Sequence, residues 1–423
     1  MQLHFSELTK PCECGMTHTF NIKPIYLEEF ALDLIPQVLQ DLNFTRHDSV
    51  LIICDENTYL AAARHVHNLI PYANIKILSN LSLISDQKGL EELQDYISLL
   101  ITKPKVILAV GSGTIHDLVK FICADMNIPF ISVPTAASVA GYTTHFSSLV
   151  INGIKKSRMH CAPLAVVADT NVLARAPYRV TASGVGDLLG KYTALADWKI
   201  ASLFGDGSFC ERTYQFQLDA INDFVPHISE LLSGSHEAYE KLMYAFFACG
   251  VATELMNHTR NVSGSEHQMA FLWEMNFKNI PRKFYHGEYV GVALLSMALY
   301  YYKILDKIQE HSLKISDPNE VEETIVCRSF PPEIARKILL HYSPSILSSV
   351  ELEELEEKLP EIARIIESIP NPNQIYMMLR QAHCASLMEE IALSSTDMED
   401  SYAVAPYLNN RITLLGLSKF FKK

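Results

Sequence analysis

Short apolar runs alternate with helical patterns along the first 175 residues of the chain. The apolar runs, which have the composition of buried strands, are Ser49–Cys54, Asn74–Leu78, Lys105–Val110, Pro129–Val133 and Leu164–Ala168. The helical patterns between them are Thr58–Leu69, Leu90–Leu100 and Ile115–Met126. Continuous apolar strands with intervening helices predict a parallel sheet covered on both faces. Right-handed crossovers then make it a doubly wound, Rossmann-like domain.

The pattern changes after Pro177, where long stretches of helical period replace the strands. These stretches are Gly186–Ser202, Ala238–Thr259, Glu288–Ile304, Glu351–Ser368 with a break or kink at Pro360, and Gln374–Leu393. Just before the change, Ser147–Asn152 predicts one more strand, followed by a turn centred on Gly153 and the basic segment Lys155–Arg158. We therefore expect an α/β fold with two domains, a dinucleotide-binding domain over residues 1–175 and an all-helical domain over residues 176–423.

The composition and net charge of the chain disfavour several classes of function. The chain has 423 residues, and 48 acidic against 35 basic residues give it a net charge of −13. This sign disfavours nucleic acid and anionic membrane surfaces as partners. No apolar run reaches the ~20 residues that span a bilayer, and the N-terminus has no secretory signal pattern. Nine cysteines in a chain of this length are no disulfide framework, which favours a reducing cytoplasm.

Cys12 and Cys14 form a Cys-x-Cys pair near the start of the chain. No second pair of Cys or His lies nearby in the sequence. We therefore interpret the two residues as surface thiols rather than as part of a structural metal site.

A glycine-rich turn is the strongest local signal of the first domain. The strand Val106–Val110 runs directly into Gly111-Ser-Gly-Thr-Ile-His-Asp117, so backbone N–H groups and a positive helix end come together where a pyrophosphate could bind. His116 stands where a third glycine is usual, and the motif alone fits a structural turn equally well. Two other segments favour a dinucleotide site. Asp55–Asn57 follows the first strand and offers an acid suited to a ribose hydroxyl, and Pro134–Ser138 follows a later strand. The carboxylate of Asp55 weakly favours NAD over NADP, because an acid near the ribose would repel a 2′-phosphate.

Three segments of the helical domain carry ionisable groups at helix starts: Asp187 between glycines, His267 after Ser263-Gly-Ser-Glu, and His286 ahead of the most apolar helix. One carboxylate and two imidazoles suit a divalent ion such as zinc, nickel or iron with an open coordination position. The three are far apart in sequence, so only tertiary folding brings them together. For each histidine alone, a capping or core role is the commoner one.

The ordered motif set closely resembles the sn-glycerol-1-phosphate dehydrogenases, members of the superfamily of iron-containing alcohol dehydrogenases and dehydroquinate synthase-like proteins. The motifs are GSGTIHD (111–117), PTAAS (134–138), GVGDLLGKYTALADW (184–198), SGSEHQMAFLWEM (263–275) and HGEYVGVA (286–293). The resemblance also takes in the N-terminal Cys-x-Cys-Gly segment, residues 162–180 and the closing residues 408–415. It covers nearly the whole chain and is strongest for the bacterial-type branch.

The resemblance implies an activity, cofactors and site residues. The activity is reversible reduction of dihydroxyacetone phosphate to sn-glycerol 1-phosphate with NADH or NADPH, catalysed by a homodimer. Asp187, His267 and His286 are implied to hold the metal in a cleft between the domains, and thereby to serve catalysis. The implied dinucleotide contacts are Gly111, Ser112, Gly113, Thr114 and Asp117 beneath the cofactor, Thr135 and Ser138 beside it, and Asp55 near the adenosine.

The phosphate of such a substrate needs cations or other donors. Candidates in or near the motifs are Lys155, Lys156, Arg158, Lys191, Arg260, His145 and His160, each individually as well explained by a structural role. Glu266, directly before a ligand, suits either outer support of the metal site or a plain helix-entry acid.

One position departs from the pattern: Ala140 stands where the family usually has an Asp that lies near the substrate hydroxyls. Three interpretations remain open, namely another residue in its place, an altered substrate, or a weakened or non-catalytic homologue that binds NAD and metal. A dehydroquinate synthase-like lyase that forms a carbocycle is a further alternative, although the basic residues are scattered.

Overall fold

The computed structural model describes residues 2–79, 85–151, 154–275, 277, 283–317 and 323–422. It divides the chain into two compact units. Unit 1 comprises residues 1–184 and 215–257, and unit 2 comprises residues 185–214 and 258–423. Two helices run across this division, α7 (Tyr178–Leu189) and α9 (Glu211–Phe224). Residues 215–257 thus belong to unit 1 although they follow residue 176, and the domain boundary expected there stays a prediction.

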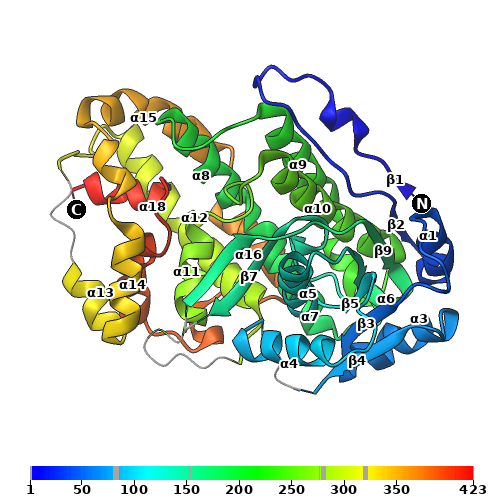
Figure 1. The fold of residues 1–423 in the computed structure, drawn as a ribbon. Coiled ribbons are helices and arrows are strands. Elements are labelled where there is room, and N and C mark those ends of the chain that lie inside the picture. The colour runs from blue at the N-terminus through cyan, green and yellow to red at the C-terminus, as the bar shows by residue number, and fades with distance from the viewer. Residues whose placement is uncertain are drawn as a thin grey trace. The chain divides into compact units, whose positions relative to one another are not determined.

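A seven-stranded sheet forms the centre of unit 1 (Figure 1). In spatial order its strands are β1 (Gln2–Leu3), β2 (Ile25–Glu28), β9 (Ala165–Asp169), β6 (Phe130–Pro134), β5 (Val106–Gly111), β3 (Val50–Asp55) and β4 (Asn74–Leu78). All neighbours are parallel except β1 and β2. The five strands expected from the sequence are confirmed to within a residue or two. The short strands β1 and β2, at one end of the strand order, were not expected from it.

Helices cover both faces of this sheet, as the continuous apolar strands predict. Alternate side chains of β3 enter different cores: Val50 and Ile52 pack in one cluster, Leu51 and Ile53 in the other. The helices of this part are α1 (Ile35–Asp41), α2 (Glu56–Thr58) and α3 (Arg64–Leu69) joined by a π-helical turn, α4 (Gln87–Ser98), α5 (Gly113–Met126) and α6 (Thr170–Ala174). The α/β fold class is therefore confirmed.

A two-stranded hairpin and a long helix complete unit 1. The hairpin pairs β7 (Phe146–Ile151) with β8 (Ile154–Met159), so the basic segment is itself a strand. The turn expected at Gly153 lies outside the described residues, as does the side chain of Lys156. The long helix α10 (His236–Met256) follows α9 and a 3-10 segment, Val225–Ser233.

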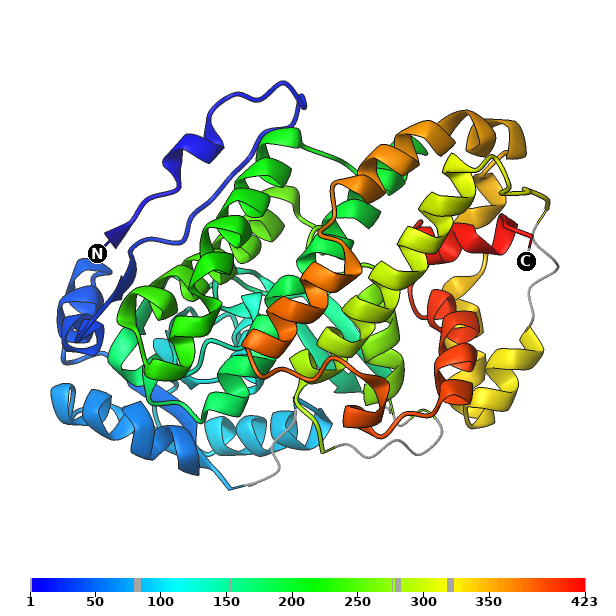
Figure 2. The ribbon, with the colours of Figure 1, turned by 180° about the vertical axis from the view of Figure 1, so that it is seen from behind.

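Unit 2 is helical throughout its described residues. Its helices are α8 (Lys191–Leu203), α11 (Ser265–Glu274), α12 (His286–Gln309), α13 (Glu323–Ser329), α14 (Pro332–Tyr342), α15 (Leu352–Glu367), α16 (Pro372–Gln381), α17 (Ser395–Val404) and α18 (Leu414–Leu417). Figure 2 shows α12 and α16 side by side, in agreement with their contacts. None of the helices described in either unit is sufficiently long and apolar to cross a bilayer.

Two helix predictions need correction. The helix expected over residues 374–393 ends at Gln381, because His383 adopts a left-handed conformation (φ 56°) and the N–H of Cys384 turns back to the carbonyl of Leu379. Of the two alternatives expected at Pro360, the break does not occur, because α15 continues through this residue, and the kink stays a prediction.

Candidate functional site

The three expected metal ligands lie together in unit 2. Asp187 is near the end of α7, His267 is in the first turn of α11, and His286 begins α12. One donor atom of each lies within 4.8 Å of the others. His267 Nε2 is 3.2 Å and His286 Nε2 is 3.7 Å from Asp187 Oδ1. Asp187 and His267 are buried and His286 is half-buried, so the cluster is a largely dry set of one oxygen and two nitrogens.

Two glycines allow the helices that carry these side chains to approach closely. A methyl group at Gly186 would lie 2.3 Å from the carbonyl oxygen of Gly287, in the first turn of α12. A methyl group at Gly264, just before α11, would lie 2.6 Å from Oδ2 of Asp197 in α8. Neither neighbour has room to move, since one is backbone and the other is a buried carboxylate. The glycines beside each ligand motif therefore serve the packing that brings the ligands together.

Each histidine is held through its Nδ1 by a carboxylate. His267 Nδ1 is 2.6 Å from Oε1 of Glu266, and His286 Nδ1 is 3.0 Å from Oε1 of Glu274. A carboxylate only accepts hydrogen bonds, so Nδ1 carries a proton, and Nε2 is the nitrogen that faces Asp187. This is the outer support that metal-binding histidines usually have. Glu266 also accepts the N–H of Gly264 (2.9 Å), as a helix-entry acid would, and its support of a metal ligand stays a prediction.

The ammonium group of Lys191 lies against the same cluster. Its Nζ is 2.8 Å from Oδ1 of Asp187 and 3.4 Å from Nε2 of His267. Burial by itself raises the pKa of Asp187, but Lys191, His267 and His286 together outweigh it and hold the pKa well below its usual range. The carboxylate is therefore ionised, as a metal ligand must be.

The donor set fits a divalent metal ion. Two neutral imidazoles and one carboxylate are the ligands of catalytic sites that leave a coordination position for substrate, and they suit zinc, nickel and iron alike. The fit rests on the convergence of both Nε2 atoms on one carboxylate and on the carboxylates behind them. A metal-binding role of Asp187, His267 and His286 stays a prediction.

A buried carboxylate anchors the start of α11. Asp197 accepts hydrogen bonds from the N–H and hydroxyl of Ser265 (2.7 and 2.8 Å), the hydroxyl of Tyr301 (2.7 Å) and the N–H of Leu414 (2.8 Å). Burial, and then the charge of Glu266, raises the pKa of Asp197 to about 6, against the effect of these donors. The residue ties together three segments that are distant in sequence.

The expected dinucleotide residues gather at the carboxyl ends of neighbouring strands in unit 1. Gly111 ends β5 and pairs with Pro134 of β6, and the N–H of Thr135 donates to the carbonyl of Gly111 (3.0 Å). Ser112 is the N-cap of α5 but makes no side-chain capping bond there, and Gly113 and Thr114 form the first turn. This helix start, which no side chain of its own caps, suits an anionic group such as a pyrophosphate.

Other predicted residues of this edge have structural contacts. Asp55 ends β3 and caps α2, accepting the N–H of Thr58 (2.8 Å). Ser138 Oγ is 3.0 Å from the hydroxyl of Tyr142. Asp117 faces β7, whose Ser148 N–H it accepts; burial raises its pKa to about 6 although Lys120 opposes this shift. These contacts occupy part of each side chain, and a role toward the dinucleotide stays a prediction for all three.

His116 explains the departure from a three-glycine motif. Its Nε2 is 2.8 Å from the hydroxyl of Ser132 on β6, and its Nδ1 is 2.9 Å from the carbonyl of Ser112. Burial lowers its pKa to about 3, helped by the charge of Lys120. The neutral imidazole thus fastens α5 to the sheet at the position where a glycine would only allow close packing.

The candidate phosphate cations that the structure describes each have their own surroundings within their unit. Arg260 is committed to Asp206 through two hydrogen bonds of 2.8 and 2.7 Å. Lys191 belongs to the cluster around Asp187, and Lys155 and Arg158 lie on the hairpin strand β8. The pKa of His160 is lowered by burial and by nearby cations.

Comparison with known proteins agrees with this architecture. The profile of the iron-containing alcohol dehydrogenases matches residues 26–177. The chain is 30% identical to the glycerol-1-phosphate dehydrogenase (NAD(P)+) of Geobacillus stearothermophilus over 420 residues, covering 96% of this chain and 95% of that one. It is 31% identical to the protein of the same name from Methanosarcina mazei, over 69% of this chain and 80% of the relative.

A solved structure has the same fold over the full length. Sulfoacetaldehyde reductase from Bifidobacterium kashiwanohense, in complex with NAD+, is 15% identical with a TM-score of 0.62, covering 96% of this chain and 97% of that one. This similarity concerns the fold alone. The 30% identity to the Geobacillus stearothermophilus protein extends along nearly the full length of both chains and shows the family. The chain belongs to the glycerol-1-phosphate dehydrogenases.

Proposed function

We propose that this protein is an NAD(P)-dependent enzyme that interconverts dihydroxyacetone phosphate and sn-glycerol 1-phosphate. The full-length similarity to glycerol-1-phosphate dehydrogenases carries the proposal. The cluster of Asp187, His267 and His286, each histidine held by a carboxylate, supports it, because this reaction polarises a carbonyl. A divalent metal bound by these residues supplies Lewis acidity toward the substrate oxygen. The protein itself keeps the carboxylate of Asp187 ionised beside Lys191 and orients the two histidines through Glu266 and Glu274.

The test is an assay of the full-length protein with dihydroxyacetone phosphate and either NADH or NADPH, after loading with zinc, nickel or ferrous ion. We expect loss of reduced cofactor that depends on both the substrate and the metal. Phosphate release without net change in the cofactor would instead indicate the dehydroquinate synthase-like lyase. Binding of NAD by calorimetry without turnover under any of the three ions would indicate a non-catalytic homologue.

We infer further that the substrate is phosphorylated, that the protein works as a homodimer and that it resides in a reducing cytoplasm. The name of its relatives supports the first inference, and the family resemblance of the sequence motifs implies the second. The cysteine content supports the third. Comparing KM for NADH and NADPH decides the cofactor preference, for which the acid at Asp55 favours NADH.

His145 is the residue that we propose in place of the acid missing at Ala140. Both lie in the loop between β6 and β7, which the buried ammonium of Lys120 holds by donating to the carbonyls of Gly141 and Phe146. His145 Nδ1 hydrogen-bonds a carboxylate oxygen of Glu254, which also accepts the backbone N–H of His145 at 3.0 Å.

The other ring nitrogen of His145, Nε2, is buried, and it is the one that we propose for a substrate hydroxyl. His145 is only 8% exposed, and its Nε2 has no hydrogen-bond partner among the atoms that the structure describes. Because Glu254 fixes the proton on Nδ1, Nε2 is an acceptor for a hydroxyl group. This is the chemistry that an Asp at position 140 would otherwise supply to substrate hydroxyls.

Two substitutions separate this role from a structural one. His145→Asn keeps a donor toward Glu254 and loses the group at Nε2, whereas His145→Gln places a polar atom near Nε2. We expect kcat/KM for dihydroxyacetone phosphate to fall about ten- to hundredfold in the Asn variant and less in the Gln variant, with KM for NADH unchanged. Adding Ala140→Asp to the Asn variant should recover part of the loss. Equal activity of wild type and the Asn variant would contradict the role.

A further inference from the structure

The closing residues of the chain, 408–415, contact the segment that leads into α11. Arg411 Nη1 donates to the carbonyl oxygen of Ser263 at 2.9 Å, and its Nη2 lies 3.5 Å from Oγ1 of Thr259. All of these residues belong to unit 2. A charged side chain from the end of the chain thus meets the backbone four residues before His267.

The peptide group between Ser263 and Gly264 is held on both sides. Its carbonyl oxygen accepts from Arg411, and its N–H, which points the opposite way, donates to Oε1 of Glu266 at 2.9 Å. The same Oε1 lies 2.6 Å from Nδ1 of His267. A continuous row of hydrogen bonds therefore runs from the guanidinium of Arg411 to the imidazole of His267.

Gly264 is also tied to this histidine through the backbone. Its carbonyl accepts the N–H of His267 at 3.2 Å and that of Gln268 at 3.1 Å, in the first turn of α11. A displacement of the Ser263–Gly264 peptide would therefore move both the backbone of His267 and the carboxylate behind its ring.

The charge of Arg411 strengthens the row of hydrogen bonds. A charged donor makes a stronger hydrogen bond than a neutral one, and bonds in a row polarise one another. The guanidinium at the carbonyl thus makes the N–H of Gly264 a better donor toward Glu266. Burial, together with the charge of Arg260, lowers the pKa of Arg411 to about 10 against the effect of nearby carboxylates. The guanidinium therefore stays charged at neutral pH.

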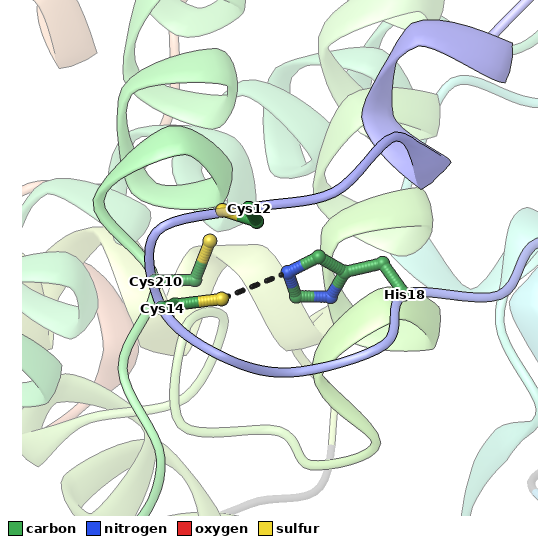
Figure 3. Close-up of side chains that lie close together, drawn as sticks. All are labelled: Cys12, Cys14, His18 and Cys210. Carbon is green, nitrogen blue, oxygen red and sulfur yellow. Dashed lines mark hydrogen bonds between the residues drawn. The ribbon is translucent and has the colours of Figure 1, made fainter.

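A histidine of unit 1 has a simpler support. Nδ1 of His18 lies 3.2 Å from the carbonyl oxygen of Leu255, at the end of α10, and its Nε2 lies 3.2 Å from Sγ of Cys14 (Figure 3). A backbone carbonyl on a helix is fixed by the helix itself. The support of His267 is instead a side chain with rotatable bonds, Glu266, which needs further groups to hold it in place.

We propose that Arg411 is a positioning residue for His267 and acts through the Ser263–Gly264 peptide and Glu266. The inference rests on the proposed function, since it takes His267 as a ligand of a divalent ion. Arg411 keeps Glu266 against Nδ1 of His267, so that Nε2 stays directed at Asp187, 3.2 Å away. This gives the closing motif of the chain a role in metal binding.

Zinc affinity of the full-length protein tests the proposal without any turnover. Titration against a chromophoric chelator measures the zinc that a His267→Gln variant fails to bind. Arg411→Gln should bind this zinc about tenfold more weakly, at the lower end of the range for a direct partner of a metal ligand, because Arg411 acts through Glu266. Arg336→Gln removes an exposed arginine of the same unit and should keep the affinity of the wild type.

A double-variant cycle separates positioning from a general loss of structure. If Arg411 acts through Glu266, Arg411→Gln should cause no further loss of zinc affinity in a Glu266→Gln protein. Arg411→Lys keeps a charged donor for the carbonyl of Ser263 and should lose only two- to threefold. If the Gln variant does not fold, this smaller loss must disappear in the Glu266→Gln background.

The Nδ1 proton of His267 gives a readout that needs no metal. Its downfield proton resonance in metal-free protein is identified by its absence from His267→Gln. It should shift in Arg411→Gln and stay in place in Arg336→Gln. An unshifted resonance, zinc affinity of Arg411→Gln within twofold of the wild type, or losses that add in the double variant would overturn the proposal. Wild-type protein without zinc at this cluster would contradict the proposed function instead, and the resonance would still decide whether Arg411 positions the ring.

Discussion

His267→Gln is expected to lose the divalent ion at the Asp187 cluster and to lower kcat with dihydroxyacetone phosphate by on the order of a thousandfold. His267 is 4% exposed, its Nε2 faces Asp187 at 3.2 Å, and its Nδ1 is held by Glu266. A metal acting as Lewis acid contributes several kcal/mol to stabilising the transition state, and each 1.36 kcal/mol corresponds to about tenfold in rate.

The matched control is His341→Gln, an exposed histidine of the same unit, in the last turn of α14. It should keep the activity and metal content of the wild type. Glu266→Gln keeps the shape of the support but not its charge, and it should cost about ten- to hundredfold in metal affinity or activity. Elemental analysis gives the metal content, and steady-state kinetics on the same preparations gives kcat. A His267→Gln enzyme with normal kcat and normal metal content would refute the assignment of the ligand.

Asp197→Ala is expected to reduce the free energy of unfolding by about 3–5 kcal/mol, because several buried donors lose their shared acceptor. The substitution removes the acceptor of Ser265, Tyr301 and Leu414 at once and leaves their donors buried. A buried donor without a partner costs about 1–3 kcal/mol. Since Ser265 begins α11, the loss also loosens the helix that carries His267.

Denaturant unfolding followed by circular dichroism measures this effect. Asp197→Asn should give an intermediate loss, because one amide oxygen remains as an acceptor while the amide nitrogen opposes the N–H groups. Asp306→Ala, at an exposed position on α12, serves as the control and should change stability by less than about 0.5 kcal/mol. A loss for Asp197→Ala no greater than for Asp306→Ala would show that the network contributes little.

The order of strands and helices in the first part of the chain could be predicted because local pattern decides it. Strands such as Val50–Asp55 and Val106–Gly111 are buried on both faces, so their sequences are apolar without interruption. The short strand Ile25–Glu28 was missed because it is only four residues long and alternates buried with half-buried positions. The end of α16 was missed because a left-handed residue, His383, ends it without a glycine or proline to mark the place.

The sequence alone determined the fold class, the identity of the candidate ligands Asp187, His267 and His286, and the family, since these rest on apolar runs and on motifs that are contiguous in the chain. Tertiary structure decided everything that depends on contacts between distant segments. It supplied Glu274 behind His286 and Lys191 beside the carboxylate of Asp187. The physical reason is that a hydrogen bond or a coordination site requires atoms within a few ångströms, and the chain order of residues on separate helices says nothing about that distance until the helices pack.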